Sequence, residues 1–134
     1  MKKMIFACLM MLCGITAFAQ DMAKGSFRNN ELMIRMEINL EKSDIPIPGL
    51  ELENCYGYIQ GAINGTWVIL KVKKLDEKGA VVRAMSDKGD VAQDIELKFT
   101  DKGLEMKQIS DSYIKGIADR KYVKLPNVVS FVKE

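Results

Sequence analysis

Apolar and polar residues alternate in the first regular stretch of the chain, residues 32–40. The apolar positions there are Leu32, Ile34, Met36, Ile38 and Leu40. Polar residues fill most of the positions between them, and Met33 is the exception. Strict alternation over this length is typical of a strand with one buried face. We therefore predict a long, half-buried strand here.

Shorter segments of β character follow, and turn residues separate each from the next. Asn64-Gly65 is a strong tight-turn signal, because both residues tolerate positive φ. Asp, Lys and Gly combine again in the segments 76–79, 87–90 and 101–103. The strands predicted around these turns are 56–59, 66–73, 80–85, 91–99, 104–109, 122–125 and 128–132.

Regular turns between alternating segments predict an antiparallel meander. We expect an all-β fold of about seven or eight strands, either barrel-like or a two-sheet sandwich, and the unbroken hairpin order favours the barrel. Residues 21–30 are polar and are expected to be loose at their start, whereas the proline-containing segment 43–49 predicts an edge or connecting loop. Residues 110–120 fit either a short helix or a strand with Gly116 as a bulge.

The N-terminus has the three parts of a secretion signal. Lys2 and Lys3 precede an apolar run over 4–15, and Ala17-Phe18-Ala19 gives a small-x-small cleavage pattern. The run is shorter than the roughly 20 apolar residues that a spanning helix needs. We therefore predict a signal peptide over 1–19, and a single β-rich domain over 20–134 that is periplasmic or secreted and has no membrane span.

A lipid anchor is not expected on the mature chain. Cys8 comes too early in the apolar run to be a lipidation site, and Cys13 follows Leu12, which is not a small residue. Only Cys55 remains after cleavage, so no internal disulfide can form. A buried, inert thiol is the favoured interpretation of Cys55, and a reactive or intermolecular thiol is the alternative.

Cleavage also changes the charge. The whole chain has 20 Lys and Arg against 18 Asp and Glu, and removal of Lys2 and Lys3 leaves 18 of each. A neutral chain with mixed charges argues against nucleic acid or an anionic membrane as the main partner. Lys115, Arg120 and the lysines at 121 and 124 make the C-terminal third locally basic. This run is interpreted as a solvated strand face or, alternatively, as a surface for an acidic partner.

The residue inventory offers little chemistry. The chain has no His, which excludes Ser-His and Cys-His nucleophilic pairs and His metal sites. Asp87, Asp90 and Asp94 do not have the spacing of a twelve-residue calcium loop. We therefore expect no enzyme activity, no cofactor and no metal. An enzyme that uses paired carboxylates is the remaining catalytic alternative.

Three aromatic residues are the candidate contact site for a ligand or partner: Tyr56, Tyr58 and Trp67. They lie on adjacent predicted strands around the Asn64-Gly65 turn, and period two places Tyr56 and Tyr58 on one face. Aromatic side chains with a polar group are common at ligand mouths and interfaces. The alternative interpretation is that all three fill the core.

Roughly half of the chain resembles a loose group of small secreted proteins from gut Bacteroidetes, mostly of unassigned function. The resemblance depends on Tyr56-Gly57-Tyr58-Ile59, Asn64-Gly65-Thr66-Trp67, Ser86-Asp87-Lys88-Gly89 and Lys121-Tyr122-Val123-Lys124-Leu125-Pro126. It implies an origin and a β-rich fold, but no activity. Periplasmic lysozyme inhibitors are similar in size and class, although their inhibitory-loop motif is not found here.

The leading hypothesis is an exported, non-catalytic binding or protein-interaction module of the cell envelope, whose partner is another envelope protein. The first alternative is a lipocalin-like barrel that holds a small apolar ligand. The second alternative is an inhibitor of an exported hydrolase.

Overall fold

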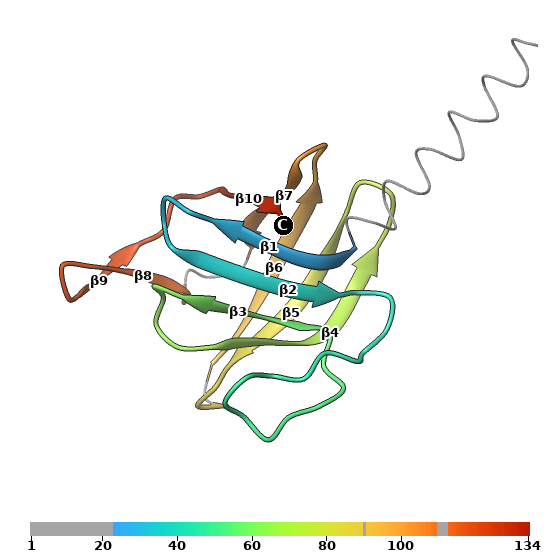
Figure 1. Cartoon of the computed structure of the whole chain (residues 1–134), viewed down its shortest axis with the longest axis horizontal. Coiled ribbons are helices and arrows are strands. Elements are labelled where there is room, and N and C mark those ends of the chain that lie inside the picture. Colours follow the sequence, from blue (N-terminus) through green and yellow to red (C-terminus); the bar gives the residue numbers. More distant parts are fainter. Residues whose placement is uncertain (1–22, 90, 110–112) are drawn as a thin grey trace, which may run out of the picture.

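The computed structural model describes residues 23–89, 91–109 and 113–134, so the expected signal peptide lies outside the described residues. This part of the chain forms ten strands and contains no helix (Figure 1). The strands are β1 (Lys24–Asn29), β2 (Ile34–Asn39), β3 (Gly57–Gly61), β4 (Trp67–Leu75), β5 (Gly79–Ser86), β6 (Ala92–Phe99), β7 (Gly103–Gln108), β8 (Lys115–Ala118), β9 (Lys121–Lys124) and β10 (Val129–Lys133). The predicted all-β class is confirmed.

Eight of these strands close into a barrel in the order β1-β10-β7-β6-β5-β4-β3-β2. Every neighbouring pair is antiparallel, and β1 to β7 follow one another as a meander. β10 fills the gap between β7 and β1, with Phe27↔Lys133 and Arg28↔Val132 as register partners on the β1 side. Closure removes the free edges of the main sheet. The predicted meander is therefore confirmed, and it closes as a barrel and not as a sandwich.

β1 occupies most of the polar segment 21–30, whose expected loose start at 21 and 22 lies outside the described residues. Six consecutive residues of β1 pair with β2, from Lys24↔Asn39 to Asn29↔Ile34. Phe27 is the only fully buried side chain in this strand. One buried residue gives no alternation to detect, so pairing with β2 and β10 decides the structure of this polar segment.

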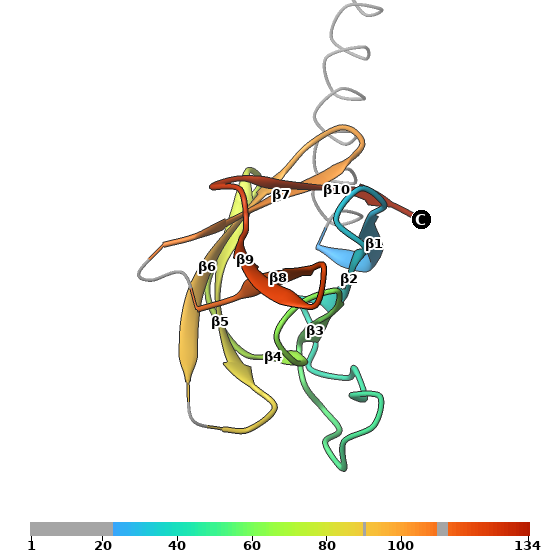
Figure 2. The same ribbon diagram turned by 90° about the vertical axis from the view of Figure 1, so that its left-hand side faces the viewer.

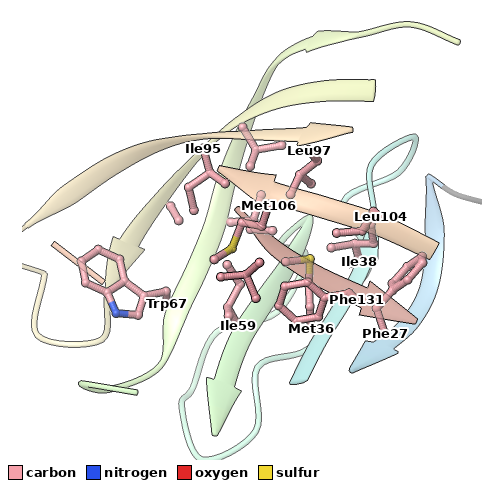
Figure 3. Packing of buried hydrophobic residues seen from close by; sticks show 14 of the residues in the cluster. Phe27, Met36, Ile38, Ile59, Trp67, Ile95, Leu97, Leu104, Met106 and Phe131 are labelled. Atoms are coloured by element: carbon pink, nitrogen blue, oxygen red, sulfur yellow. The ribbon is translucent and has the colours of Figure 1, made fainter. Parts of the chain in front are cut away.

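The barrel interior is filled by the apolar faces of its strands. Alternation in β2 buries Ile34, Met36 and Ile38, while Arg35 stays exposed. These residues join one cluster with large side chains from other strands (Figure 3), among them Phe27, Ile59, Trp67, Leu97, Leu104, Met106 and Phe131. Full burial of each such side chain contributes about 1.5–3 kcal/mol to folding.

A smaller cluster lies on the outside of the barrel wall. The segment between β2 and β3 folds back so that Ile47 and Cys55 pack on Tyr58 and Val68. Its one β-bridge joins Ile45 to Cys55, so 43–49 is a connecting loop, as predicted. Cys55 is 5% exposed, and burial raises the pKa of its thiol. The interpretation of Cys55 as a buried thiol is therefore confirmed.

Candidate binding site on the β8–β9 hairpin

The β8–β9 hairpin forms a separate two-stranded sheet at one end of the barrel. Figure 2 shows it in front of that end of the barrel. Ile114, just before β8, is fully buried, and Leu125, just after β9, is 6% exposed. Both belong to the barrel core. The hairpin is therefore anchored in the core on both sides, although all four residues of β9 are exposed.

Asn64 holds the start of the hairpin. Its side-chain carbonyl accepts the backbone N–H of Lys115 at 2.9 Å and the indole N–H of Trp67 at 3.3 Å. Its side-chain NH₂ donates to the carbonyl of Tyr113 at 2.8 Å. One amide in the turn after β3 thus fixes both the approach to β8 and the orientation of Trp67.

Two glutamines hold the same segment from the opposite wall. The Gln108 side chain donates to the carbonyl of Ile114 at 3.1 Å and accepts its N–H at 3.0 Å. Gln93, which is 1% exposed, accepts the N–H of Tyr113 at 3.1 Å. Burial of a side-chain amide costs free energy unless the amide is hydrogen-bonded. These bonds supply partners for the two amides and also order the start of the hairpin.

The hairpin turn has an unusual conformation for its sequence. Asp119 and Arg120 connect the two strands, and both have positive φ, 52° and 66°. A two-residue turn with two positive φ values is type I′, which favours Asn-Gly or Asp-Gly. Holding Arg120 there costs about 1 kcal/mol, because the left-handed region is unfavourable for a residue with a Cβ.

The register of the hairpin sets which side chains share a face. Ile117 lies opposite Tyr122, and Lys115 lies opposite Lys124. These four residues face the same way by period two, and we call them the hairpin face. Ile117 is 43% exposed and Tyr122 is 69% exposed. The hairpin face is therefore an exposed apolar pair beside a pair of like charges.

Positive charge dominates the hairpin. Its cations are Lys115, Arg120, Lys121 and Lys124, and its only carboxylate is Asp119. None of the ion pairs among residues 23–89, 91–109 and 113–134 involves these cations. Like charges placed directly opposite each other destabilise a strand pair by about 0.2–1 kcal/mol. The hairpin face is thus unfavourable for the isolated protein in both its charge and its exposed apolar area.

A groove runs between the hairpin and the β1–β2 turn. It has a volume of about 190 Å³ and is lined mainly by apolar residues, including Leu32, Met33, Ile117, Val123 and Leu125. Met33 is 70% exposed. The groove places further exposed apolar surface next to the hairpin face.

The predicted aromatic site is divided between the two sides of the barrel wall. Trp67 is 1% exposed within the core, and Tyr58 is 3% exposed in the outer cluster. The phenol of Tyr58 donates to a carboxylate oxygen of Glu37 at 2.7 Å. Burial first, and then this hydrogen bond and the charge of Glu37, raise the pKa of Tyr58 to about 12.

The expectation that Tyr56 and Tyr58 share a face is wrong. Tyr56 is partly buried against the barrel core, opposite to Tyr58. The N–H of Tyr56 donates to the carbonyl of Ile69, which is also the register partner of Gly57. Tyr56 and Gly57 together therefore oppose one residue, as in a bulge, and this extra residue interrupts period two. The three aromatics pack in two clusters and do not form one contact patch.

Other candidate chemistry is equally separated. Asp94 pairs with Lys73 at 3.0 Å, whereas Asp87 lies in the turn beside Gly65, and Asp90 lies outside the described residues. Within the described ranges, no three His, Cys, Asp or Glu side chains are grouped so as to hold a metal ion. The same ranges contain no helix with the length and apolarity to cross a membrane.

The four basic residues were identifiable from the sequence, but their arrangement was not. Asp119-Arg120 is not a typical turn signal, so the β8–β9 register could not be assigned. Without that register, the sequence does not show that Ile117 lies opposite Tyr122. The structure also resolves the alternatives for 110–120 where it describes them: 115–118 is a strand and not a helix.

No protein-family model matches the chain, and neither a curated protein nor a solved structure is significantly similar to it. The resemblance to secreted Bacteroidetes proteins stays a prediction.

Proposed function

We propose that this protein is exported and serves as a non-catalytic binding module, whose β8–β9 hairpin contacts an acidic partner protein of the cell envelope. The observation that carries this proposal is the hairpin face itself. An exposed Ile117–Tyr122 pair lies beside opposed Lys115 and Lys124, and neither lysine has an ion-pair partner in the described structure.

A partner with carboxylates removes both unfavourable features of this face. Carboxylates beside Lys115 and Lys124 relieve the repulsion between the lysines, and complementary charge also speeds association. Contact buries the Ile117–Tyr122 pair, and each Å² of apolar area removed from water contributes about 25 cal/mol. Tyrosine and arginine are among the residue types enriched at the energetic centres of protein interfaces, and Tyr122 and Arg120 supply both.

The anchoring of the hairpin supports a role in binding. Ile114 and Leu125 hold its two ends in the core, and the Asn64 and Gln108 side chains fix the backbone of residues 113–115 at the start of β8. A surface that is already ordered loses little conformational entropy when a partner binds. The hairpin is therefore well suited to recognise a rigid or extended partner surface.

The filled barrel favours surface binding over an interior ligand. Trp67, Phe27 and Phe131 are each at most 2% exposed inside the barrel. A lipocalin-like function requires space among these side chains for the ligand. An exported hydrolase whose cleft is lined with carboxylates meets the same chemical requirement as other acidic partners. The inhibitor hypothesis is therefore one form of this proposal.

In-cell photo-cross-linking tests the proposal. p-Benzoylphenylalanine replaces Tyr122 on the hairpin, and in a control chain it replaces Lys102, which is exposed in the β6–β7 turn at the other end of the barrel. We expect one dominant cross-linked envelope protein at position 122 and none of it at position 102. We also expect the product to disappear when Lys115→Glu and Lys124→Glu are added.

A matched double variant separates local charge from net charge. Lys42→Glu with Lys102→Glu changes the net charge equally at exposed sites away from the hairpin, and it should leave the cross-link intact. The absence of any product at position 122 overturns the proposal. So does a product that survives Lys115→Glu with Lys124→Glu. Export itself is tested by N-terminal sequencing of the protein from cells, which should begin at Gln20.

A further inference from the structure

The two edges of the β8–β9 sheet differ. On the β8 side, the turn after β3 occupies the edge: Gly116 bridges to Ile63, and the N–H of Ile117 donates to the carbonyl of Ala62 at 2.9 Å. The carbonyl of Lys115 also accepts the N–H of Asn64 at 3.0 Å. On the other side, β9 has no neighbouring strand among the described residues. β9 therefore presents the open edge of this sheet.

From this asymmetry we propose that an extended acidic segment of the partner adds to the open edge of β9 as a further strand. This inference rests on the proposed function and specifies how the hairpin binds. Strand addition supplies main-chain hydrogen bonds for affinity, and the side chains on either side supply specificity.

The register identifies which backbone groups are available. In a hairpin with a two-residue turn, hydrogen-bonded and non-hydrogen-bonded pairs alternate outward from the turn. Lys115 and Ile117 direct their backbone groups away from β9, towards residues 62–64. Their register partners, Lys124 and Tyr122, therefore direct theirs away from β8. Each of these two residues offers one N–H and one C=O to an added strand.

Charge selects an acidic strand over a second copy of this chain. Pairing of β9 with another β9 would bring Lys121 and Lys124 of both copies together, and opposed like charges destabilise strand pairs. Lysine on an edge strand is a common protection against such self-association. The same lysines attract carboxylates on a segment that runs along the edge. The basic edge thus excludes self-pairing and favours an acidic segment.

The side chains of β9 define the pattern of this segment. A residue opposite Lys121 or Lys124 should be acidic, and a residue opposite Tyr122 or Val123 should be apolar. A suitable probe is the peptide Ac-Thr-Glu-Val-Val-Glu-Thr-NH₂, because its glutamates meet the two lysines in either strand direction. Its lysine analogue, Ac-Thr-Lys-Val-Val-Lys-Thr-NH₂, is the control for charge.

Backbone N-methylation tests strand addition directly. Adjacent residues of a strand direct their N–H groups to opposite edges, so only one of the two valine N–H groups can bond to β9. We expect the acidic peptide to bind the full chain and to slow hydrogen exchange at the amides of Tyr122 and Lys124. N-methylation of the valine whose N–H bonds to β9 removes that hydrogen bond and should weaken binding at least about tenfold. N-methylation of the other valine removes no bond to β9 and should weaken binding by less than about twofold.

The other outcomes contradict specific parts of the inference. Equal binding by both N-methylated peptides overturns strand addition, while cross-linking at position 122 would still support the proposed function. No binding of the unmodified peptide at about 1 mM also overturns strand addition. Binding of the lysine analogue overturns the selection by charge. Stronger binding to phosphatidylglycerol vesicles than to the peptide would replace the protein partner with an anionic membrane.

Discussion

The backbone N–H of Lys115 donates to the side-chain carbonyl of Asn64 at 2.9 Å, across 51 residues of sequence. This bond connects the tight turn after β3 to the first residue of β8. The same oxygen accepts the indole N–H of Trp67, so one amide couples the packed interior of the barrel to the exposed hairpin. The geometry of the hairpin is therefore set by residues far from it in sequence.

Replacement of this amide should loosen the hairpin. Asn64→Ala leaves the N–H of Lys115 and the carbonyl of Tyr113 without their partner, and we expect the free energy of unfolding to fall by about 1–3 kcal/mol. Urea denaturation measures this loss, and hydrogen exchange at Lys115 should become faster. Asn39→Ala is the matched control, because Asn39, the last residue of β2, also makes two side-chain hydrogen bonds, and both of these are exposed. Equal losses in the two variants would show that Asn64 has no special role.

The turn should tolerate a change that removes its strain. Arg120→Gly places the residue with the least steric cost at φ 66°, and we expect it to raise the free energy of unfolding by about 0.5–1 kcal/mol. Arg120→Ala removes the same guanidinium but keeps the strain, so it should give no such gain. A stability that is equal in the two variants would contradict the assignment of strain to this position.

Tyr58 should titrate well above the ordinary pKa of a tyrosine. Burial and the hydrogen bond to Glu37 raise its pKa to about 12 from the ordinary value of 10.0. Because the folded state favours the neutral phenol, its contribution to stability is complete below about pH 10 and is lost as the pH rises towards about 12. The free energy of unfolding of the wild type should fall more steeply over this window than that of Tyr58→Phe. Identical slopes, or a single tyrosinate transition near pH 10 in ultraviolet absorbance, would contradict this account.

The barrel strands could be predicted where one face is apolar and the other is not. β2 and β6 show this alternation clearly, and the Asp-Lys-Gly turns mark the ends of several strands. β1 could not be predicted, because Phe27 is its only fully buried side chain. Tyr56 was assigned to the wrong face for a different reason. Its irregular pairing opposite Ile69 depends on a hydrogen bond between two segments of the chain. The alternation of apolar and polar residues within one segment does not reveal such an irregularity.

Only part of the candidate site could be predicted. The basic character of residues 115–124 is visible in the sequence, but the contact of Gly116 with Ile63 is not, because it joins segments far apart in the chain. Trp67 was predicted as a contact residue because it is aromatic, but its large apolar ring is among the most fully buried side chains of the core. Tyr122 is also an aromatic residue with a polar group, and only the structure shows that it is exposed.

Relief of the opposed lysines should stabilise the isolated protein. Lys124→Glu turns the Lys115–Lys124 pair into an ion pair, and we expect the free energy of unfolding to rise by about 0.5 kcal/mol at low salt. Lys98→Glu is the contrasting control, because Lys98 lies opposite Glu105 and the change creates a like-charge pair there. That variant should lose stability. A loss of stability in both variants would show that the two lysines do not repel each other in the native hairpin.

The central claim is that the hairpin face is kept for binding at the expense of stability. The measurement that tests it most directly is the yield of the partner cross-link from position 122 in the Lys124→Glu background. Lys124→Glu places a carboxylate against the carboxylates of the partner, and like-charge juxtaposition costs several kcal/mol of binding, so the yield should fall at least tenfold while stability rises. An unchanged yield in a stabilised variant would contradict the claim.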